Sequence, residues 1–364
     1  MNRNGAWARV VLTLATGVLA SCAPNQGRTM SQDSVRTTDG AGGRRAPEPL
    51  RPVATYSIVA RDGRTGELGV AVQSHWFSVG TVVPWAEAGV GAVATQSLVD
   101  PKYGPEGLRL MREGRSASEA LAVLLAADEG RELRQVAMVD AQGRAGVHTG
   151  ARCIGEAGDD SAITRDGSII SCQANLMRGP SVPEALKRGF DSLSDDAPLA
   201  ERLLMALKWA ERSGGDVRGK QSAAILVVAP QSTGQPWKDR LVDLHVEDHP
   251  APLDEMTRLL RLHRAYERMN KGDEAMEKGD IPGAVEQYSE ARRLAPGNAE
   301  MSFWAGVALV NAGKIAEGEP LLAEAFSDKN GGDWRTTLRR LPRAGLLPDD
   351  QELIERLARL PAAD

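Results

Sequence analysis

Thr55 is the residue of this chain with the clearest chemical potential, because it opens the first strand-like segment after a long polar stretch. A threonine at the start of a domain can act as an N-terminal nucleophile: its hydroxyl attacks a carbonyl carbon while the freed α-amino group takes the proton. Within a longer chain the Thr55 nitrogen is an amide and cannot be that base. Catalysis therefore requires cleavage between Ala54 and Thr55; otherwise Thr55 is a β-branched residue that begins a strand.

Further polar side chains lie within or at the ends of apolar strand-like segments. Buried polar groups must find partners, so these residues either tie loops together or meet a ligand. We predict that Ser74 orients the nucleophile and that Asn175 or Gln173 donates to an oxyanion. The same prediction assigns substrate contacts to Gln73, His75, Gln96, Asp100, Gln173, Asp216, Arg218, Gln221 and Ser222.

The segment 216–222 is the densest of these polar motifs and stands directly before an apolar strand. Asp216 and Arg218 can pair, and Gly219 permits close approach of another backbone. Gln221 and Ser222 then face the cleft. The alternative is that the segment is a structural hydrogen-bond clamp at the start of the strand.

The histidines and the cysteines follow no motif of metal or nucleophile chemistry. His148, His245 and His249 lack a compact ligand spacing, and His245 and His249, around Asp248 at a strand end, are interpreted as loop anchors, so we predict neither a metal nor a cofactor. Besides Cys22, the chain has Cys153 and Cys172. These two either form a disulfide or are small buried apolar residues, because the sequence does not reveal their separation.

The elements that must position these residues come in blocks of strands and blocks of helices. Strands are predicted at 55–62, 67–74, 88–96, 133–140, 144–149, 169–176, 222–228 and 241–247, and helices at 104–113, 116–126, 182–193, 199–212 and from 253. This order excludes the strict alternation of a doubly wound sheet. It favours an α+β domain with two stacked sheets between helical layers.

Four blocks, at 55–62, 80–96, 214–223 and 241–250, resemble the DUF1028 family. The resemblance covers the chain from about Thr55 to Leu260. It implies a four-layer αββα sandwich of the N-terminal nucleophile (Ntn) hydrolase type. Because members of this family are largely uncharacterised, it implies the fold more firmly than the reaction. Many relatives begin with Met-Thr, so that loss of methionine exposes the threonine, whereas Thr55 lies inside this chain.

The N-terminal residues have the layout of a secretory signal. Arg3 and Arg9 precede the apolar stretch 10–19, which is too short to span a bilayer. Leu19-Ala-Ser-Cys22 resembles a bacterial lipobox, so residues 1–22 are expected to be a lipoprotein signal with Cys22 as the lipidated residue; the alternative is an ordinary secretory peptide. Residues 23–53 predict a disordered tether. We expect a protein anchored to a membrane of the bacterial cell envelope, outside the cytoplasm.

Beyond about Ala265 the pattern changes to one helix after another. Segments 275–296 and 304–314 resemble tetratricopeptide repeats (TPR), with Pro296 ending a helix. We therefore predict an Ntn-hydrolase-like domain at 54–262 and a small all-α, TPR-like domain at 263–364. Such helices imply a docking groove for a peptide or protein; the alternative is an extension that packs on the sandwich or mediates dimerisation.

Composition does not single out a partner. The net charge is −5, and no run of Lys and Arg is interleaved with aromatic residues, so nucleic-acid binding is not expected. Two functions remain. The first is an envelope-anchored hydrolase of an amide or peptide-like bond, with Thr55 as nucleophile. The second is a non-catalytic lipoprotein that binds a small ligand and docks a partner through its TPR-like helices. A purely structural role, including homo-oligomer assembly, is a third possibility.

Overall fold

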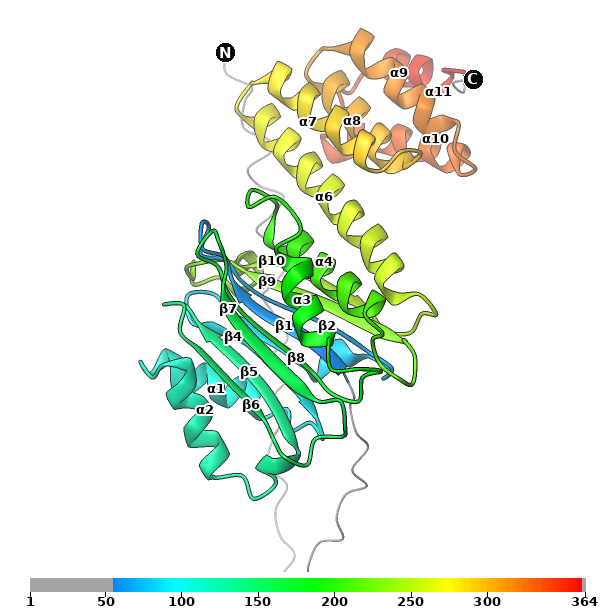
Figure 1. Ribbon diagram of the computed structural model, residues 1–364. Coiled ribbons are helices and arrows are strands. Elements are labelled where there is room, and N and C mark those ends of the chain that lie inside the picture. The colour runs from blue at the N-terminus through cyan, green and yellow to red at the C-terminus, as the bar shows by residue number, and fades with distance from the viewer. Residues whose placement is uncertain (1–54, 362–364) are drawn as a thin grey trace, which may run out of the picture. The chain divides into compact units, whose positions relative to one another are not determined.

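The computed structural model describes residues 55–361, which divide into two compact units (Figure 1). The first unit contains all the strands and ends at Tyr266; the second is helical and begins at Glu267. This division falls inside helix α6 (Pro252–Glu277), whereas the sequence predicted a boundary at 262/263. The predicted signal, Cys22, the tether and the Ala54–Thr55 bond lie outside the described residues.

A six-stranded antiparallel sheet forms the centre of the first unit. Its order is β10 (Arg240–Val246), β9 (Ser222–Val228), β2 (Leu68–Ser74), β1 (Thr55–Arg61), β8 (Ile169–Ala174) and β7 (Gly158–Ile163). Thr55 pairs with Ser74, and Ser74 pairs with Ser222. Three hydroxyl side chains therefore lie side by side at one end of the sheet.

A second antiparallel sheet has four strands, in the order β3 (Pro84–Glu87), β4 (Gly91–Ser97), β5 (Arg134–Asp140) and β6 (Ala145–Thr149). The two sheets pack face to face through small apolar residues, among them Val59 and Val72 from the first sheet and Ala94 and Ala137 from the second. Side chains alternate between the faces of a strand, so every second residue of β1, β2, β4 and β5 faces the opposite sheet.

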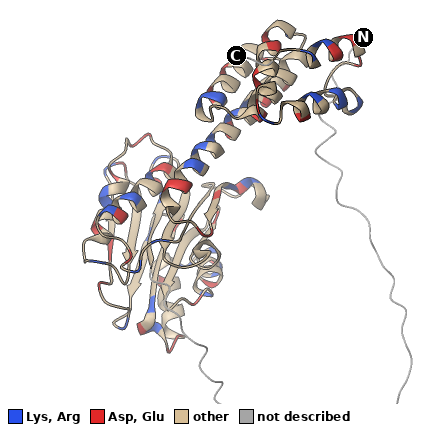
Figure 2. Ribbon diagram, turned by 90° about the vertical axis from the view of Figure 1, so that its right-hand side faces the viewer, with Lys and Arg blue, Asp and Glu red and all other residues tan. Residues whose placement is uncertain are grey.

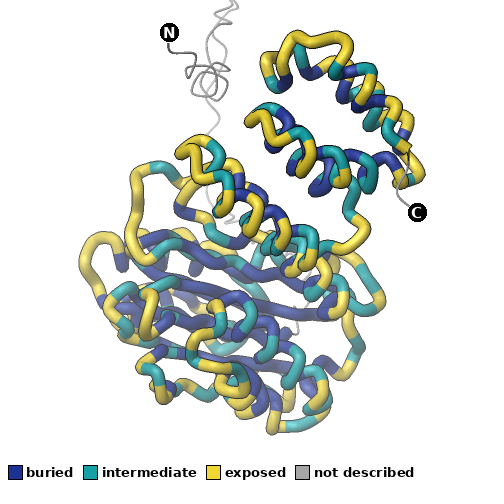
Figure 3. The backbone as a smooth tube through the Cα atoms, turned by 90° about the horizontal axis from the view of Figure 1, so that it is seen from above, coloured by how far each residue is buried: buried dark blue, intermediate teal, exposed yellow. Residues whose placement is uncertain are grey.

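Helices cover the outer face of each sheet (Figure 1). Helices α3 (Val182–Phe190) and α4 (Leu199–Arg212) pack on the six-stranded sheet, and α1 (Tyr103–Arg112) and α2 (Ala117–Ala126) pack on the four-stranded sheet. Helix α2 begins with a capping box: the Ser116 hydroxyl accepts from the Glu119 N–H at 3.2 Å, and the Glu119 carboxylate accepts from the Ser116 N–H at 2.8 Å. Charged residues lie mainly on helices and loops (Figure 2), and the inner strands of the two sheets are the most buried elements (Figure 3).

The predicted strands and helices of this unit all occur, and two strands were not predicted. Both are edge strands: β3 has only four residues, too few to show an alternation, and β7 is mostly polar. The short helix α5 (Pro236–Asp239) joins β9 to β10, and 3-10 turns occupy Val79–Thr81 and Arg131–Leu133.

The second unit contains α7 (Ile281–Leu294), α8 (Ala299–Asn311), α9 (Ile315–Phe326), α10 (Gly331–Arg340) and α11 (Gln351–Ala358), with a 3-10 turn at Pro342–Ala344. Gly306 and Gly318 let α8 and α9 approach closely, because a Cβ atom on Gly318 would lie 2.8 Å from the Gly306 carbonyl oxygen. The mixed α/β class and the C-terminal helical region are thus confirmed, while the TPR likeness stays a prediction. Among the described helices, none combines the length and apolarity needed to cross a bilayer.

Candidate functional site

Thr55 lies between the two sheets, where both of them hold it. As the first residue of β1 it shares the inner face with Ser57 and Val59, and it is fully buried. Its Oγ1 donates to Ser74 Oγ at 3.3 Å. Its carbonyl oxygen accepts from Gln96 Nε2 in β4 and from the Asn175 backbone N–H after β8, each at 3.1 Å. The backbone position of Thr55 is therefore fixed on both sides.

A network of buried amides extends from Thr55 into the second sheet. Gln96 Nε2 donates to Gln135 Oε1 at 2.7 Å, and Asn175 Nδ2 donates to the same oxygen at 2.9 Å. Gln135 Nε2 donates to the carbonyls of Ala174 at 2.9 Å and Gly158 at 3.1 Å. A carbonyl oxygen can only accept, so these two carbonyls determine which way the Gln135 amide is turned. That choice in turn orients Gln96 and Asn175.

Ser57 and Gln173 complete the network. Ser57 Oγ donates to Gln96 Oε1 at 2.7 Å, and Gln173 Nε2 lies 3.2 Å from Ser57 Oγ and 3.0 Å from the Ala94 carbonyl oxygen. Gln173 Oε1 and Asn175 Oδ1 are buried and have no hydrogen-bond partner within residues 55–361. Two buried acceptors near Thr55 are thus left without a hydrogen-bond partner in the described part of the chain.

Neither Gln135 nor Ser57 was among the predicted site residues, although each carries a recognisable signal. Gln135 is in phase with Ala137 and Val139, and Ser57 is in phase with Val59, so each is a polar residue on an otherwise apolar, inward-facing side of a strand. Polar residues in that phase are the ones that must pair with each other between the sheets.

The chain segments around Thr55 also store backbone strain. Four non-glycine residues within 55–361 have positive φ, and three of them lie at or shortly after the strand ends at this site: Ser78 (56°), Ser97 (69°) and Leu176 (57°). A non-glycine residue in this conformation costs on the order of 1–3 kcal/mol, and such residues concentrate at functional sites. Their clustering marks this end of the sheets as a site that the fold maintains at a cost.

The predicted polar motif at 216–222 borders the site and clamps the end of β2. Arg218 pairs with Asp216 through Nη2 and Nε, at 2.8 and 3.1 Å, and the same carboxylate accepts from the His75 backbone N–H at 3.1 Å. The Gln221 N–H donates to the Ser74 carbonyl oxygen at 3.0 Å. Ser222 Oγ accepts from the Val79 N–H at 3.1 Å and donates to the Trp76 carbonyl. These contacts position Ser74 beside Thr55.

Three other predicted site residues do not join the Thr55 cluster. Gln73 faces the helices with its strand partner Tyr56, and its buried amide nitrogen and oxygen have no hydrogen-bond partner within residues 55–361. The His75 side chain is exposed. The Asp100 carboxylate binds Lys102, accepting from its N–H at 3.2 Å and pairing with its ammonium at 2.8 Å.

The histidines are anchored separately. His148 Nε2 lies 2.8 Å from the Arg131 carbonyl oxygen, and His249 Nδ1 accepts from the Ala251 N–H at 3.0 Å. His245 lies 2.9 Å from the Asp243 carboxylate, and this hydrogen bond raises the pKa of the imidazole. Over residues 55–361, no group of three or more His, Cys, Asp or Glu side chains is arranged to hold a metal ion.

Cys153 and Cys172 are both free thiols, so the disulfide alternative does not describe this structure. Cys172 is fully buried in the apolar core beneath α3 and α4, and burial raises the pKa of its thiol. Burial also raises the pKa of Cys153, whose Sγ donates to the Arg134 carbonyl oxygen at 3.3 Å. Neither thiol is therefore activated as a nucleophile.

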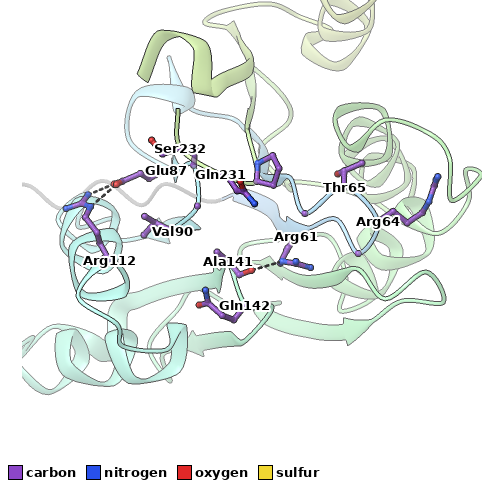
Figure 4. Close-up of a pocket in the computed structure, with 15 residues that line it drawn as sticks. Arg61, Arg64, Thr65, Glu87, Val90, Arg112, Ala141, Gln142, Gln231 and Ser232 are labelled. Carbon is purple, nitrogen blue, oxygen red and sulfur yellow. Dashed lines mark hydrogen bonds and ion pairs between the residues drawn. The ribbon is translucent and has the colours of Figure 1, made fainter. Parts of the chain in front are cut away.

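An open hollow of about 840 Å³ lies beside Arg61, at the end of β1 opposite to Thr55; Figure 4 shows its lining residues. It is lined by residues 61, 63–66, 87–90, 112, 141–142 and 230–232, and we call it the Arg61 pocket. None of the predicted site residues lines it. The polar cluster around Thr55 and this hollow are therefore two separate features of the same unit.

Comparison with known proteins identifies the family. Residues 55–256, more than half of the chain, match the model of DUF1028, a family of unknown function. The crystal structure of a Silicibacter pomeroyi protein assigned to DUF1028 is 29% identical over 57% of this chain and 88% of that chain, with a TM-score of 0.49. A search of curated proteins finds no match. The resemblance recognised in the sequence is confirmed, and this chain belongs to the DUF1028 family.

Proposed function

We propose that this protein is an amide hydrolase of the Ntn type, that its two sheets and helical layers are the αββα sandwich of that class, and that Thr55 becomes the nucleophile once the Ala54–Thr55 bond is cut. The observation that carries the proposal is the placement of Thr55. Its Oγ1 is hydrogen-bonded to Ser74 at 3.3 Å while its carbonyl is held from both sheets. A nucleophile held in one position loses little entropy on the way to the transition state.

The reaction uses two groups of Thr55, the side-chain hydroxyl as nucleophile and the α-amino group as base. Cleavage makes the Thr55 nitrogen a primary amine, which takes the proton from Oγ1 as that oxygen attacks the carbonyl carbon of the substrate amide. A C–O bond forms, and the carbonyl oxygen becomes an oxyanion. The oxyanion collapses, the C–N bond breaks, and the α-ammonium group gives its proton to the leaving nitrogen. Water then hydrolyses the Thr55 ester and releases the acid.

The neighbouring residues supply the supporting contacts. Ser74 Oγ, 3.3 Å from Oγ1, orients the nucleophile. Asn175 Nδ2 spends one N–H on Gln135 at 2.9 Å and has a second N–H for the oxyanion. The unpaired Oδ1 of Asn175 and Oε1 of Gln173 can accept from a substrate N–H group. Full burial of Thr55 is consistent with a precursor that becomes accessible only after processing.

The N-terminal sequence supports a location in the cell envelope, and the proposed cut before Thr55 would change it. Arg3, Arg9, the apolar stretch 10–19 and the lipobox-like Leu19-Ala-Ser-Cys22 support secretion and lipid anchoring in the cell envelope. A cut before Thr55 separates the domain from Cys22. The proposal therefore includes two forms, an anchored precursor and a released domain with Thr55 at its terminus.

The first test is the N-terminal sequence and intact mass of the protein recovered from cells, followed by incubation with a β-lactone, which acylates N-terminal threonines. We expect a species that begins at Thr55 and gains one acyl group. The Thr55→Ala variant should lose labelling by at least about 10³-fold because the hydroxyl that the β-lactone acylates is gone. Thr65→Ala, a change at an exposed threonine, should label like the parent protein. If the lipidated chain is recovered and no species begins at Thr55, the mechanism is excluded.

A second function, binding without catalysis, is favoured by one observation. The Arg61 pocket is open, whereas Thr55 at the other end of β1 is fully buried. In that case the protein is a lipoprotein that binds a small ligand in the first unit and docks a protein partner through its TPR-like helices. An intact N-terminus combined with saturable ligand binding would favour this function.

A further inference from the structure

We propose that the Arg61 pocket binds a small molecule through an anionic oxygen group, a carboxylate or a phosphate. The pocket lies about 20 Å from Thr55, the length of a seven-residue strand. The inference therefore depends neither on cleavage before Thr55 nor on catalysis there.

Turns from both sheets build this pocket. Its lining comes from the turn between β1 and β2, the turn between β3 and β4, the turn between β5 and β6, the loop after β9 and Arg112 at the end of α1. Arg61, the last residue of β1, projects among them (Figure 4). The volume of the pocket, about 840 Å³, lies in the range of roughly 300–1,000 Å³ that is typical of small-molecule sites.

The charged residues of the lining give the pocket its preference for anions. They are three arginines and one glutamate; since Arg64 and Arg112 are paired with carboxylates, the surplus positive charge is that of Arg61. Arg112 uses its guanidinium on Glu87, with Nε 2.7 Å from Oε1 and a second contact through Nη2. Arg64 donates to the Asp195 carbonyl oxygen at 2.8 Å and pairs with Asp196. Two of the three arginines are therefore already engaged.

Arg61 is the arginine whose charge is not balanced. Its Nε donates to the Ala141 carbonyl oxygen at 2.8 Å and its Nη1 to the Asp62 carbonyl oxygen at 3.4 Å, and it forms no ion pair within residues 55–361. Neutral carbonyls hold the side chain in place without cancelling its charge. A half-buried guanidinium fixed in this way offers its remaining N–H groups as a planar fork, which matches a carboxylate or a phosphate.

The space beside this guanidinium is kept open by Gly66. The residue has a φ of 75°, and a Cβ atom there would lie 3.6 Å from Arg61 Nη2 and 3.1 Å from Pro230 Cβ. Gln142, on the turn after β5, uses its Oε1 to accept from Arg144 at 3.2 Å, which leaves its amide N–H groups for a ligand. The pocket thus combines an unbalanced cation, neutral donors and free volume.

The test is titration of the full chain with inorganic phosphate and, separately, with succinate, followed by calorimetry at constant ionic strength. We expect saturable binding of at least one anion, and Arg61→Gln should weaken it at least 10-fold. Arg64→Gln is the matched control, because the Arg64 side chain is held by Asp195 and Asp196. The affinity of this variant for the anion should stay within about twofold of that of the parent protein. Phosphate-only or succinate-only binding identifies which anionic group the pocket prefers.

A second variant tests the pocket independently, in case Arg61→Gln does not fold. Gln142→Glu places a carboxylate in the pocket from an exposed turn and leaves Arg61 unchanged. It should also weaken anion binding at least 10-fold. The proposal is overturned if neither anion binds saturably, if Gln142→Glu binds like the parent protein, or if Arg64→Gln loses as much affinity as Arg61→Gln.

Discussion

Gln135 joins the two sheets through a single amide group. Its oxygen accepts from Gln96 and Asn175, and its nitrogen donates to the carbonyls of Ala174 and Gly158. Because Gln135 is fully buried, its partners cannot form hydrogen bonds with water instead if the amide is removed. A buried polar group without a partner costs about 1–3 kcal/mol. The residue is therefore a structural centre of the network that holds Thr55.

Gln135→Met keeps the size of the side chain and deletes its polar atoms. We expect the free energy of unfolding to fall by about 3 kcal/mol, because Asn175 and the Ala174 carbonyl lose their partner. Urea denaturation followed by circular dichroism measures the change. The same substitution at the exposed Gln142 should stay within about 0.5 kcal/mol of the parent protein. Equal effects at the two positions would contradict the role assigned to the network.

The predictability of the site depended on which face of a strand each residue occupies. Ser74, Gln96 and Gln173 could be recognised as polar residues in apolar strands, and they lie near Thr55 or in its amide network. Gln73 has the same sequence signal, but successive residues of a strand point to opposite faces, so it cannot share the face of Ser74. Only the pairing of β1 with β2 reveals which of the two faces the second sheet.

At the scale of elements, local signals determined what the sequence could predict. Helix α4 occupies the predicted residues because its apolar positions repeat with the helical period, and α2 because its capping box is local. β7 has no such signal: its residues alternate between half-buried and exposed, and Ile163 is 75% exposed. The strand exists because its backbone pairs with β8, which a sequence does not show.

Arg202 connects helix α4 to two turns of the first sheet. It is 1% exposed, its guanidinium lies 2.6 Å from Asp166 and 3.5 Å from Asp62, and it stacks 4.0 Å over the Phe190 ring. Removing one partner of a buried ion pair leaves the other charge unpaired, at a cost of about 3–5 kcal/mol. We expect Arg202→Met to lose that much stability in urea denaturation. Arg188→Met, which breaks an exposed pair with Glu184, should lose at most about 1 kcal/mol.

The pH profile distinguishes this ion pair from simple packing. Burial raises the pKa of Asp166, but hydrogen bonds from Arg202, Thr164 and Ser168 lower it further, so the folded value lies well below the ordinary 3.8. A carboxyl group with a lowered pKa contributes stability above its unfolded pKa and loses it as the pH falls towards the folded value. Wild-type stability should therefore drop below about pH 4. Arg202→Met should drop less steeply there, and parallel profiles would exclude the ion pair as the cause.

At the scale of the whole molecule, each unit has its own hydrophobic core. The cores of the first unit draw on residues between Tyr56 and Leu260, whereas the core of the helical unit draws on residues between Phe303 and Ala358. The sequence indicated a helical region after the strand-containing one, because the change from strand blocks to successive helices is visible in the periodicity. The exact boundary was less predictable, since α6 continues across it without a break in helical pattern.

Separate cores predict separate unfolding transitions. Phe303 is fully buried and packs against Trp304 and Trp334, with ring centroids 5.0 and 4.8 Å apart. Phe303→Ala should cost about 3–5 kcal/mol and lower the melting temperature of the helical unit by roughly 10 °C or more. Scanning calorimetry should show that the transition of the first unit stays in place.

Phe190→Ala is the reciprocal variant, because Phe190 is fully buried in the core beneath α3 and α4. It should lower the transition of the first unit and leave that of the helical unit unchanged. If either substitution lowered both transitions equally, the two cores would unfold as one cooperative unit despite sharing no residues. Independent shifts would instead mean that Thr55 chemistry and anion binding can be altered in the first unit without changing the stability of the helices that follow it.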